Sequence, residues 1–121
     1  AELRRHSPEG FSVGYSVDWN AVEGLLVGGD AWYSVVAGLF PRVSMALVQA
    51  AQRGDAVKVR AQNARLEPFW ALFKEFSGLR VMYASADLLG ICRAEPPRPI
   101  LPLPEAARRR VAETLKTLDL S

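Results

Sequence analysis

One apolar run, residues 31–36 (AWYSVV), limits the possible folds of this chain more than any other part of the sequence. It follows the glycine pair at 28–29 and precedes a turn that closes at Pro41. A continuous apolar run of this length, without alternating polar residues, is typical of a strand that is buried on both faces, as in parallel sheets. We therefore expect a core strand over residues 31–36, in a sheet that is covered on both sides.

The segment before this run predicts a strand and a short helix. Residues 11–16 (FSVGYS) are expected as the first strand. Asp18 is a candidate N-cap for a helix whose apolar residues recur at helical spacing, and the glycine pair ends that helix. Two strands joined by such a crossover lie parallel, but two strands alone form no stable sheet. The missing strands must come from other chains or from a larger parallel α/β fold, and we expect the larger fold.

The remaining sequence predicts four helices and one extended arm. Each helix is bounded by residues that favour helix ends, such as proline or aspartate at the start and glycine at the end. Pro68 should bend or interrupt the longest helix, because proline lacks the backbone N–H that a helix interior needs. The expected elements are a helix from Pro41 to Gly54, a long helix from Asp55 towards Gly78, a short helix over Met82–Leu89, a proline-rich arm over 96–104 and a last helix over Glu105–Leu118.

The composition argues against several classes of function. The net charge of +2 is too small for a dedicated nucleic-acid binder, and the basic cluster at 108–110 is spread around a helix. We therefore expect a solvated face there and no nucleic-acid partner. No apolar run reaches the ~20 residues of a membrane span, so we expect no membrane partner. His6 and Cys92 form neither a metal-ligand cluster nor a catalytic pair, so we expect no metal and no cofactor. The lone cysteine fits a reducing compartment, and we expect a cytoplasmic protein.

Residues 15–43 (YSVDWNAVEGLLVGGDAWYSVVAGLFPRV) resemble the seventh and eighth βα units of the dihydrodipicolinate synthase/N-acetylneuraminate lyase family. The last strand of that family usually reads Gly-x-Ile-Ser-Val-x-x-Asn-x-x-Pro, and residues 31–41 are similar to it in order and spacing. The resemblance continues through the segments AAQRGD, LEPFWALF, ADLLGI and PPRPILPLPE. It implies an α/β fold, the C-terminal part of a (β/α)8 TIM barrel, which as a whole takes ~250 residues. Residues 1–54 would be the last two barrel units, and residues 55–121 a C-terminal helical extension.

The resemblance also implies an activity. In this family a lysine on an earlier strand forms a Schiff base with the carbonyl of a 2-keto acid, typically pyruvate, and the imine then acts as an electron sink. The lysines of this chain, Lys58, Lys74 and Lys116, all fall on expected helices beyond the last strand. We therefore expect no catalytic residue here and no activity from this chain alone. The implied partners are a small 2-keto acid substrate and further copies of the protein, in a homodimer or homotetramer.

The substrate-pocket candidates lie after the two strands, because barrel active sites are built at the C-terminal ends of strands. The resemblance places Ser16 and Asp18 after the seventh strand, and Tyr33 and Ser34 on the eighth. Tyr33 stands where the family usually has Ile, beside the bound keto acid. Local roles are also open, with Asp18 as a helix N-cap and Ser34 as a partner of backbone groups.

Two further points keep the function open. Val17, Tyr33 and Gly38 depart from the family's usual Gly, Ile and Asn, which suggests a different aldehyde partner or an activity that has lapsed. A second class of function is a non-catalytic, mostly helical interaction module that is complete at this length. It would account for the helix-rich second half and the missing lysine, but it leaves the doubly buried strand without a cover.

Overall fold

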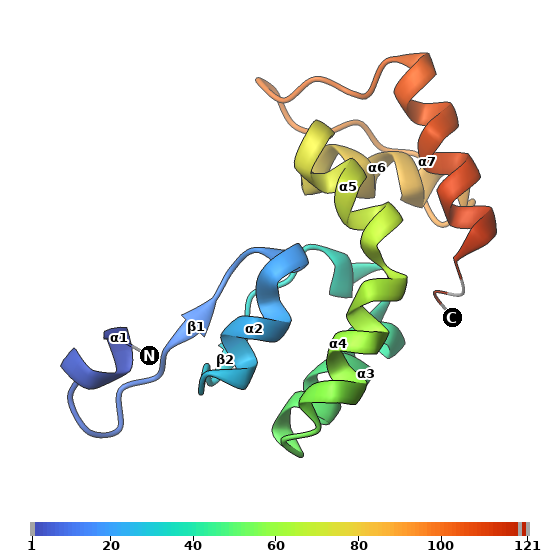
Figure 1. Ribbon diagram of the computed structural model, residues 1–121. Helices are drawn as coiled ribbons and strands as arrows, with labels where there is room; N and C mark the ends of the chain where they lie inside the picture. Colours follow the sequence, from blue (N-terminus) through green and yellow to red (C-terminus); the bar gives the residue numbers. More distant parts are fainter. Residues whose placement is uncertain (1, 119, 121) are drawn as a thin grey trace.

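The computed structural model describes residues 2–118 and 120, in which a small parallel sheet lies at one end and a group of helices at the other (Figure 1). Short 3-10 turns at Asp18–Asn20 and Val36–Gly38 follow the two strands. The elements in chain order are α1 (Glu2–His6), β1 (Gly14–Tyr15), α2 (Ala21–Leu26), β2 (Ala31–Trp32), α3 (Pro41–Gln52), α4 (Ala56–Arg65), α5 (Glu67–Phe76), α6 (Gly78–Leu88) and α7 (Glu105–Thr117).

The two strands pair in parallel, as the short crossover through α2 predicts. Gly14 pairs with Ala31 and Tyr15 with Trp32. One backbone hydrogen bond extends the pairing at each end, from Asp30 N to Val13 O and from Tyr33 N to Tyr15 O, both at 2.8 Å. Both strands are shorter than the predicted ranges 11–16 and 31–36, because each has only one neighbour among the described residues and a strand without ladder bonds on both sides is poorly held.

The second half of the expected strand 31–36 is not extended. Val36 instead begins a 3-10 turn and is buried against the helices. Tyr33 and Val35 are 68% and 40% exposed, so the described residues do not cover this part of the chain on both sides. The apolar run correctly indicated a strand at its start, but it did not indicate where that strand ends.

The helix expected from Asp55 towards Gly78 is broken in two. Asp55 does cap α4, since its carboxylate accepts a hydrogen bond of 3.0 Å from Lys58 N. The chain leaves the helix at Leu66 and starts again, so that Pro68 lies in the first turn of α5, where its missing N–H costs nothing. The next helix, α6, starts at Gly78, four residues before the predicted Met82, directly after the turn at Ser77.

An aromatic cluster joins the helices. The ring centre of Phe69 lies 5.0 Å from that of Phe73 and 5.9 Å from that of Phe40, and the Trp70 ring packs edge-on against Phe73. All four side chains are buried, and the indole N–H of Trp70 donates to Asn63 Oδ1 at 3.0 Å. This core connects α3 with α5, so the helical extension is packed directly onto the last βα unit.

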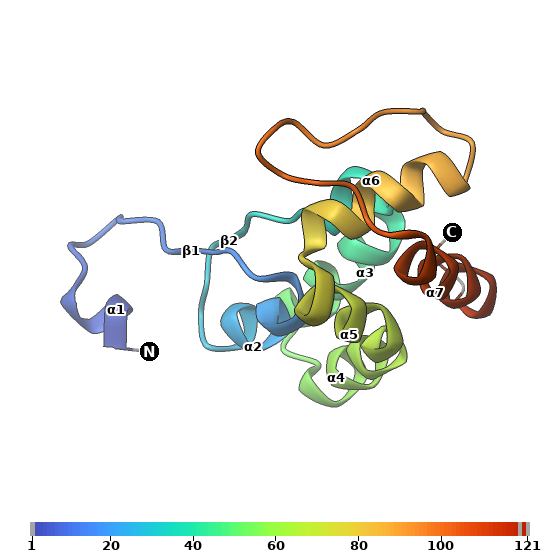
Figure 2. The same ribbon diagram turned by 90° about the horizontal axis from the view of Figure 1, so that it is seen from above.

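The arm between α6 and α7 loops out and returns to its own fold, as Figure 2 shows. The guanidinium of Arg80 on α6 donates to the carbonyls of Leu101 and Pro102, at 2.7 and 3.0 Å. The last helix is held by Arg110, which donates two hydrogen bonds of 2.6 and 2.7 Å to the Glu75 carboxylate on α5. The arm is therefore an ordered part of the fold.

Candidate functional site at the strand ends

The site is centred on the carboxylate of Asp18, which joins the ends of β1 and β2. Ser34 Oγ donates to Asp18 Oδ1 at 2.7 Å, and Val35 N approaches both carboxylate oxygens at 3.2 and 3.3 Å. Ser34 Oγ in turn accepts a hydrogen bond of 2.9 Å from Ala37 N. Asp18 is only 5% exposed, so its lone pairs are directed at these donors rather than at water.

Asp18 is not the helix N-cap that the sequence suggests. Neither the 3-10 turn at Asp18–Asn20 nor α2 has a side-chain cap hydrogen bond. The two donors from the other strand end occupy the carboxylate instead, and hydrogen bonds to a charged acceptor are stronger than those between neutral groups. Ser34 does take the local role that was left open, because its hydroxyl bonds a backbone N–H.

Tyr33 lies on the open side of the same strand end. Its ring covers Gly14: a Cβ atom at that glycine would lie 2.1 Å from Tyr33 Cε2. Tyr33 is 68% exposed, and its hydroxyl has no hydrogen-bond partner among the described residues. Ser16 is exposed nearby in the chain but shares no hydrogen bond with the other candidates. The structure thus brings Asp18 and Ser34 into contact, whereas Tyr33 and Ser16 are exposed and bond neither of them.

Sequence reasoning missed two contributors to this geometry. The backbone N–H of Val35 donates to Asp18. Because every residue except proline has this group, the residue type at position 35 does not reveal the contact. Tyr15 packs its ring on Gly24 of α2, where a Cβ atom would lie 2.7 Å from Tyr15 Cγ, and its hydroxyl accepts 2.9 Å from Asn20 Nδ2. Gly24, in the middle of a short helix, could have indicated this contact, because a glycine there lets another side chain approach the helix backbone closely.

Charged side chains around the sheet are paired on the surface. Asp30 accepts from Val13 N at 2.7 Å and forms an ion pair with Arg4, and these contacts hold the pKa of its carboxyl below the ordinary value. A two-bond contact from Arg60 on α4 to Glu23 on α2 likewise lowers the pKa of Glu23. These pairs connect α1 and α4 with the βα units on the surface.

The described residues provide neither a buried lysine nor a metal site. The side chains of Lys58, Lys74 and Lys116 are exposed on α4, α5 and α7, and Lys74 is paired with Glu67 at 2.8 Å. Within residues 2–118 and 120 there is no group of three or more His, Cys, Asp or Glu side chains that could hold a metal ion. Over the same residues no helix is long and apolar enough to cross a membrane.

Comparison with known proteins identifies the family of this chain. The pattern of the dihydrodipicolinate synthetase family matches residues 2–118. The 4-hydroxy-tetrahydrodipicolinate synthase of Alcanivorax borkumensis is 34% identical over 98% of this chain and 40% of its own length. A solved structure of dihydrodipicolinate synthase from Agrobacterium tumefaciens has 49% identity and a TM-score of 0.91, over 98% of this chain and 40% of that one.

The fold is shared more widely than the sequence. The structure of dihydrodipicolinate synthase from Aquifex aeolicus has 23% identity and a TM-score of 0.87, over 95% of this chain and 39% of that one. The chain thus spans about 40% of the length of the relatives it matches. Its fold is the C-terminal part of a TIM barrel followed by C-terminal helices, and the match does not favour a separate helical interaction module. The chain belongs to the dihydrodipicolinate synthetase family.

Proposed function

We propose that the natural protein carrying this chain is a lyase or aldolase that forms a Schiff base with pyruvate or another 2-keto acid. In this proposal residues 1–54 supply the last two βα units of the barrel, and residues 55–121 are the helical extension. The observation that supports it is the joined end of the two parallel strands, where Asp18 holds Ser34 and Val35 in place. Barrel enzymes build their active sites at this end of the strands.

Each candidate residue has a role in this proposal that fits its surroundings. Tyr33 lines the pocket, because its ring is exposed and its hydroxyl can form a hydrogen bond with a substrate oxygen. Asp18 acts through Ser34, whose position it fixes, and Ser16 lies at the rim. The Schiff base is formed by a lysine other than Lys58, Lys74 and Lys116, since those three are exposed on helices after β2. A Schiff-base lysine needs a desolvated setting, which an exposed helix face does not offer.

The same proposal includes a substrate class, an oligomeric state and a cellular compartment. Its substrate is a small 2-keto acid, and it assembles as a homodimer or homotetramer. The free thiol of Cys92 is exposed, which fits a reducing compartment, and we place the protein in the cytoplasm.

Trapping with borohydride tests the proposed chemistry. The natural full-length protein is incubated with pyruvate, reduced, and weighed by mass spectrometry, with a sample reduced without pyruvate as the control. Borohydride reduces an imine to a stable amine, so we expect one adduct per subunit. A folded protein that is trapped by no 2-keto acid contradicts the Schiff-base proposal, while the barrel fold stands.

A kinetic variant tests the role of Tyr33. We expect Tyr33→Ile to change the KM for the keto acid or its aldehyde partner by about fivefold or more, because a pocket side chain sets substrate discrimination. Phe11→Ile, at an exposed aromatic residue before the start of β1, is the matched control and should leave both KM values unchanged. Equal kinetics for the wild-type protein and Tyr33→Ile would remove Tyr33 from the pocket.

A further inference from the structure

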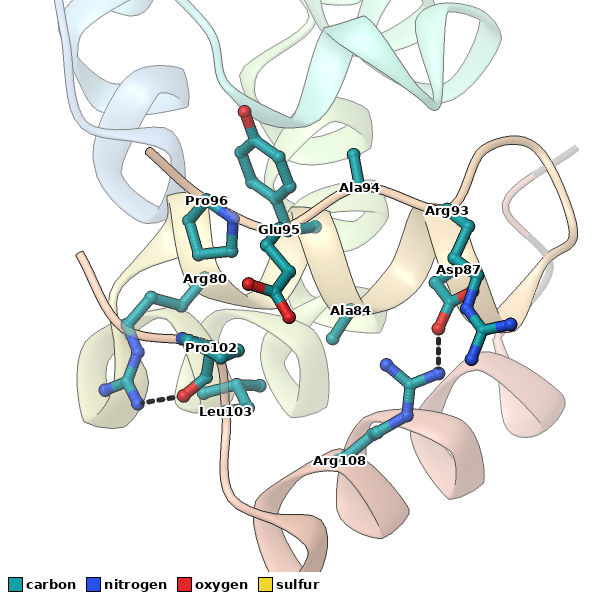
Figure 3. A pocket seen from close by; sticks show the side chains of 11 residues that line it. Arg80, Ala84, Asp87, Arg93, Ala94, Glu95, Pro96, Pro102, Leu103 and Arg108 are labelled. Carbon is teal, nitrogen blue, oxygen red and sulfur yellow. Dashed lines mark hydrogen bonds and ion pairs between the residues drawn. The ribbon is translucent and has the colours of Figure 1, made fainter. Parts of the chain in front are cut away.

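A second site candidate lies away from the strand ends, in a cavity of about 280 Å³ between α6, the arm and α7 (Figure 3). Its walls include apolar groups, among them Ala84, Pro96 and Leu103. Five charged side chains line it as well: Arg80, Asp87, Arg93, Glu95 and Arg108.

The arginines of this cavity are not equally available. Arg108 forms an ion pair with Asp87, so its charge is neutralised locally. Arg80 donates through Nε and Nη2 to two carbonyls of the arm, which are neutral acceptors, and its Nη1 has no hydrogen-bond partner among the described residues. Arg93 has neither a hydrogen bond nor an ion pair to any described residue. Within residues 2–118 and 120, the charges of Arg80 and Arg93 thus have no carboxylate partner.

The available charges are spread across the cavity. In Figure 3 Arg80 and Arg93 lie on opposite sides, and the Glu95 carboxylate points into the space between them. Glu95 has no ion pair among the described residues. A single compact anion such as phosphate binds best where donors converge on one point, whereas separated guanidinium groups suit an anion with two separated carboxylates.

We propose that this cavity binds a small organic dicarboxylate, with one carboxylate at Arg80 and the other at Arg93. Three arginines against two acidic side chains leave the cavity with a positive balance. The Glu95 carboxylate opposes the anion and limits its affinity. The site is formed by α6, the arm and α7 and does not depend on the proposed Schiff-base chemistry.

Calorimetric titration of the natural full-length protein with succinate tests the proposal. We expect saturable binding, which Arg93→Gln weakens about fivefold or more through the loss of a charge-assisted contact. Arg98→Gln is the matched control, because Arg98 is exposed on the same arm and does not line the cavity; it should change the affinity less than about twofold. Glu95→Gln should strengthen binding about two- to fivefold by removing a repelling charge.

Three results would overturn the site. The first is no heat of binding at succinate concentrations up to about 20 mM. The second is an equal loss with Arg93→Gln and Arg98→Gln, which would mean general attraction by surface charge. The third is inorganic phosphate binding as tightly as succinate. Thermal unfolding of each variant verifies that the arm and α7 stay folded.

Discussion

Replacing Asp18 tests the junction of the two strand ends most sharply. Asp18→Ala removes the acceptor of Ser34 Oγ and of Val35 N, in a position that is 5% exposed. Hydrogen bonds to a charged group contribute about 1.5–3 kcal/mol each, and a donor left buried without a partner costs a similar amount. The Ser34 hydroxyl is half-buried and can turn towards water, so we expect a loss of about 2–4 kcal/mol in the free energy of unfolding.

The control for this prediction is another aspartate with one local role. Asp55 is exposed and caps α4 through a single hydrogen bond to Lys58 N, so Asp55→Ala should cost only about 1 kcal/mol. Urea denaturation of the natural full-length protein measures both losses. A double-mutant cycle with Ser34→Ala should give a coupling of about 1 kcal/mol between Asp18 and Ser34. If Asp18→Ala costs no more than Asp55→Ala, the Asp18 carboxylate does not hold the two strand ends together.

Three further predictions concern packing, the sheet surface and pH. Phe69→Ala should destabilise the protein by about 3–5 kcal/mol in urea denaturation, because Phe69 is fully buried in the aromatic cluster, whereas the half-exposed Phe11→Ala should cost far less. Gly14→Ala should displace the Tyr33 ring, since the new Cβ atom would lie 2.1 Å from Tyr33 Cε2, and a crystal structure showing an unmoved ring would contradict the packing described above. The pKa of Glu75 is lowered from its ordinary 4.5 by hydrogen bonds from Arg110, so its contribution to stability is fully present above pH 4.5 and is lost as the pH falls through the lower, folded-state value. The urea concentration at the midpoint of unfolding should therefore decrease as the pH falls below 4.5, and this decrease should be smaller in Glu75→Gln. The same pH dependence in the wild-type protein and in Glu75→Gln would show that the pair contributes nothing.

The sequence predicts the order of elements well, because apolar spacing and helix-end residues act locally. The parallel pairing of β1 and β2 follows from the short α2 crossover, and the break near Pro68 follows from the missing N–H of proline. The resemblance in residues 15–43 correctly assigned the family and the partial barrel. These features depend on short segments, and short segments are what a single sequence displays.

Contacts between segments were beyond such reasoning. Asp18 has the residue type and position of an N-cap, and only the arrival of Ser34 and Val35 from sixteen and seventeen residues away turns its carboxylate elsewhere. The early end of β2 also depends on distant segments, because β2 has a single neighbouring strand among the described residues and Val35 N bonds Asp18 beyond its end. The cavity beside α6 is also invisible in the sequence, since only the path of the arm places Arg93 across the cavity from Arg80.

The position of the trapped lysine tests the central claim most directly. After reduction with pyruvate, the natural full-length protein is digested and the adduct is located by peptide mass spectrometry. We predict that the modified lysine lies outside residues 1–121, with Lys58, Lys74 and Lys116 unmodified. An adduct on one of these three lysines would contradict the claim that this chain lines the pocket with Tyr33 and Ser34 but leaves the covalent chemistry to another part of the barrel.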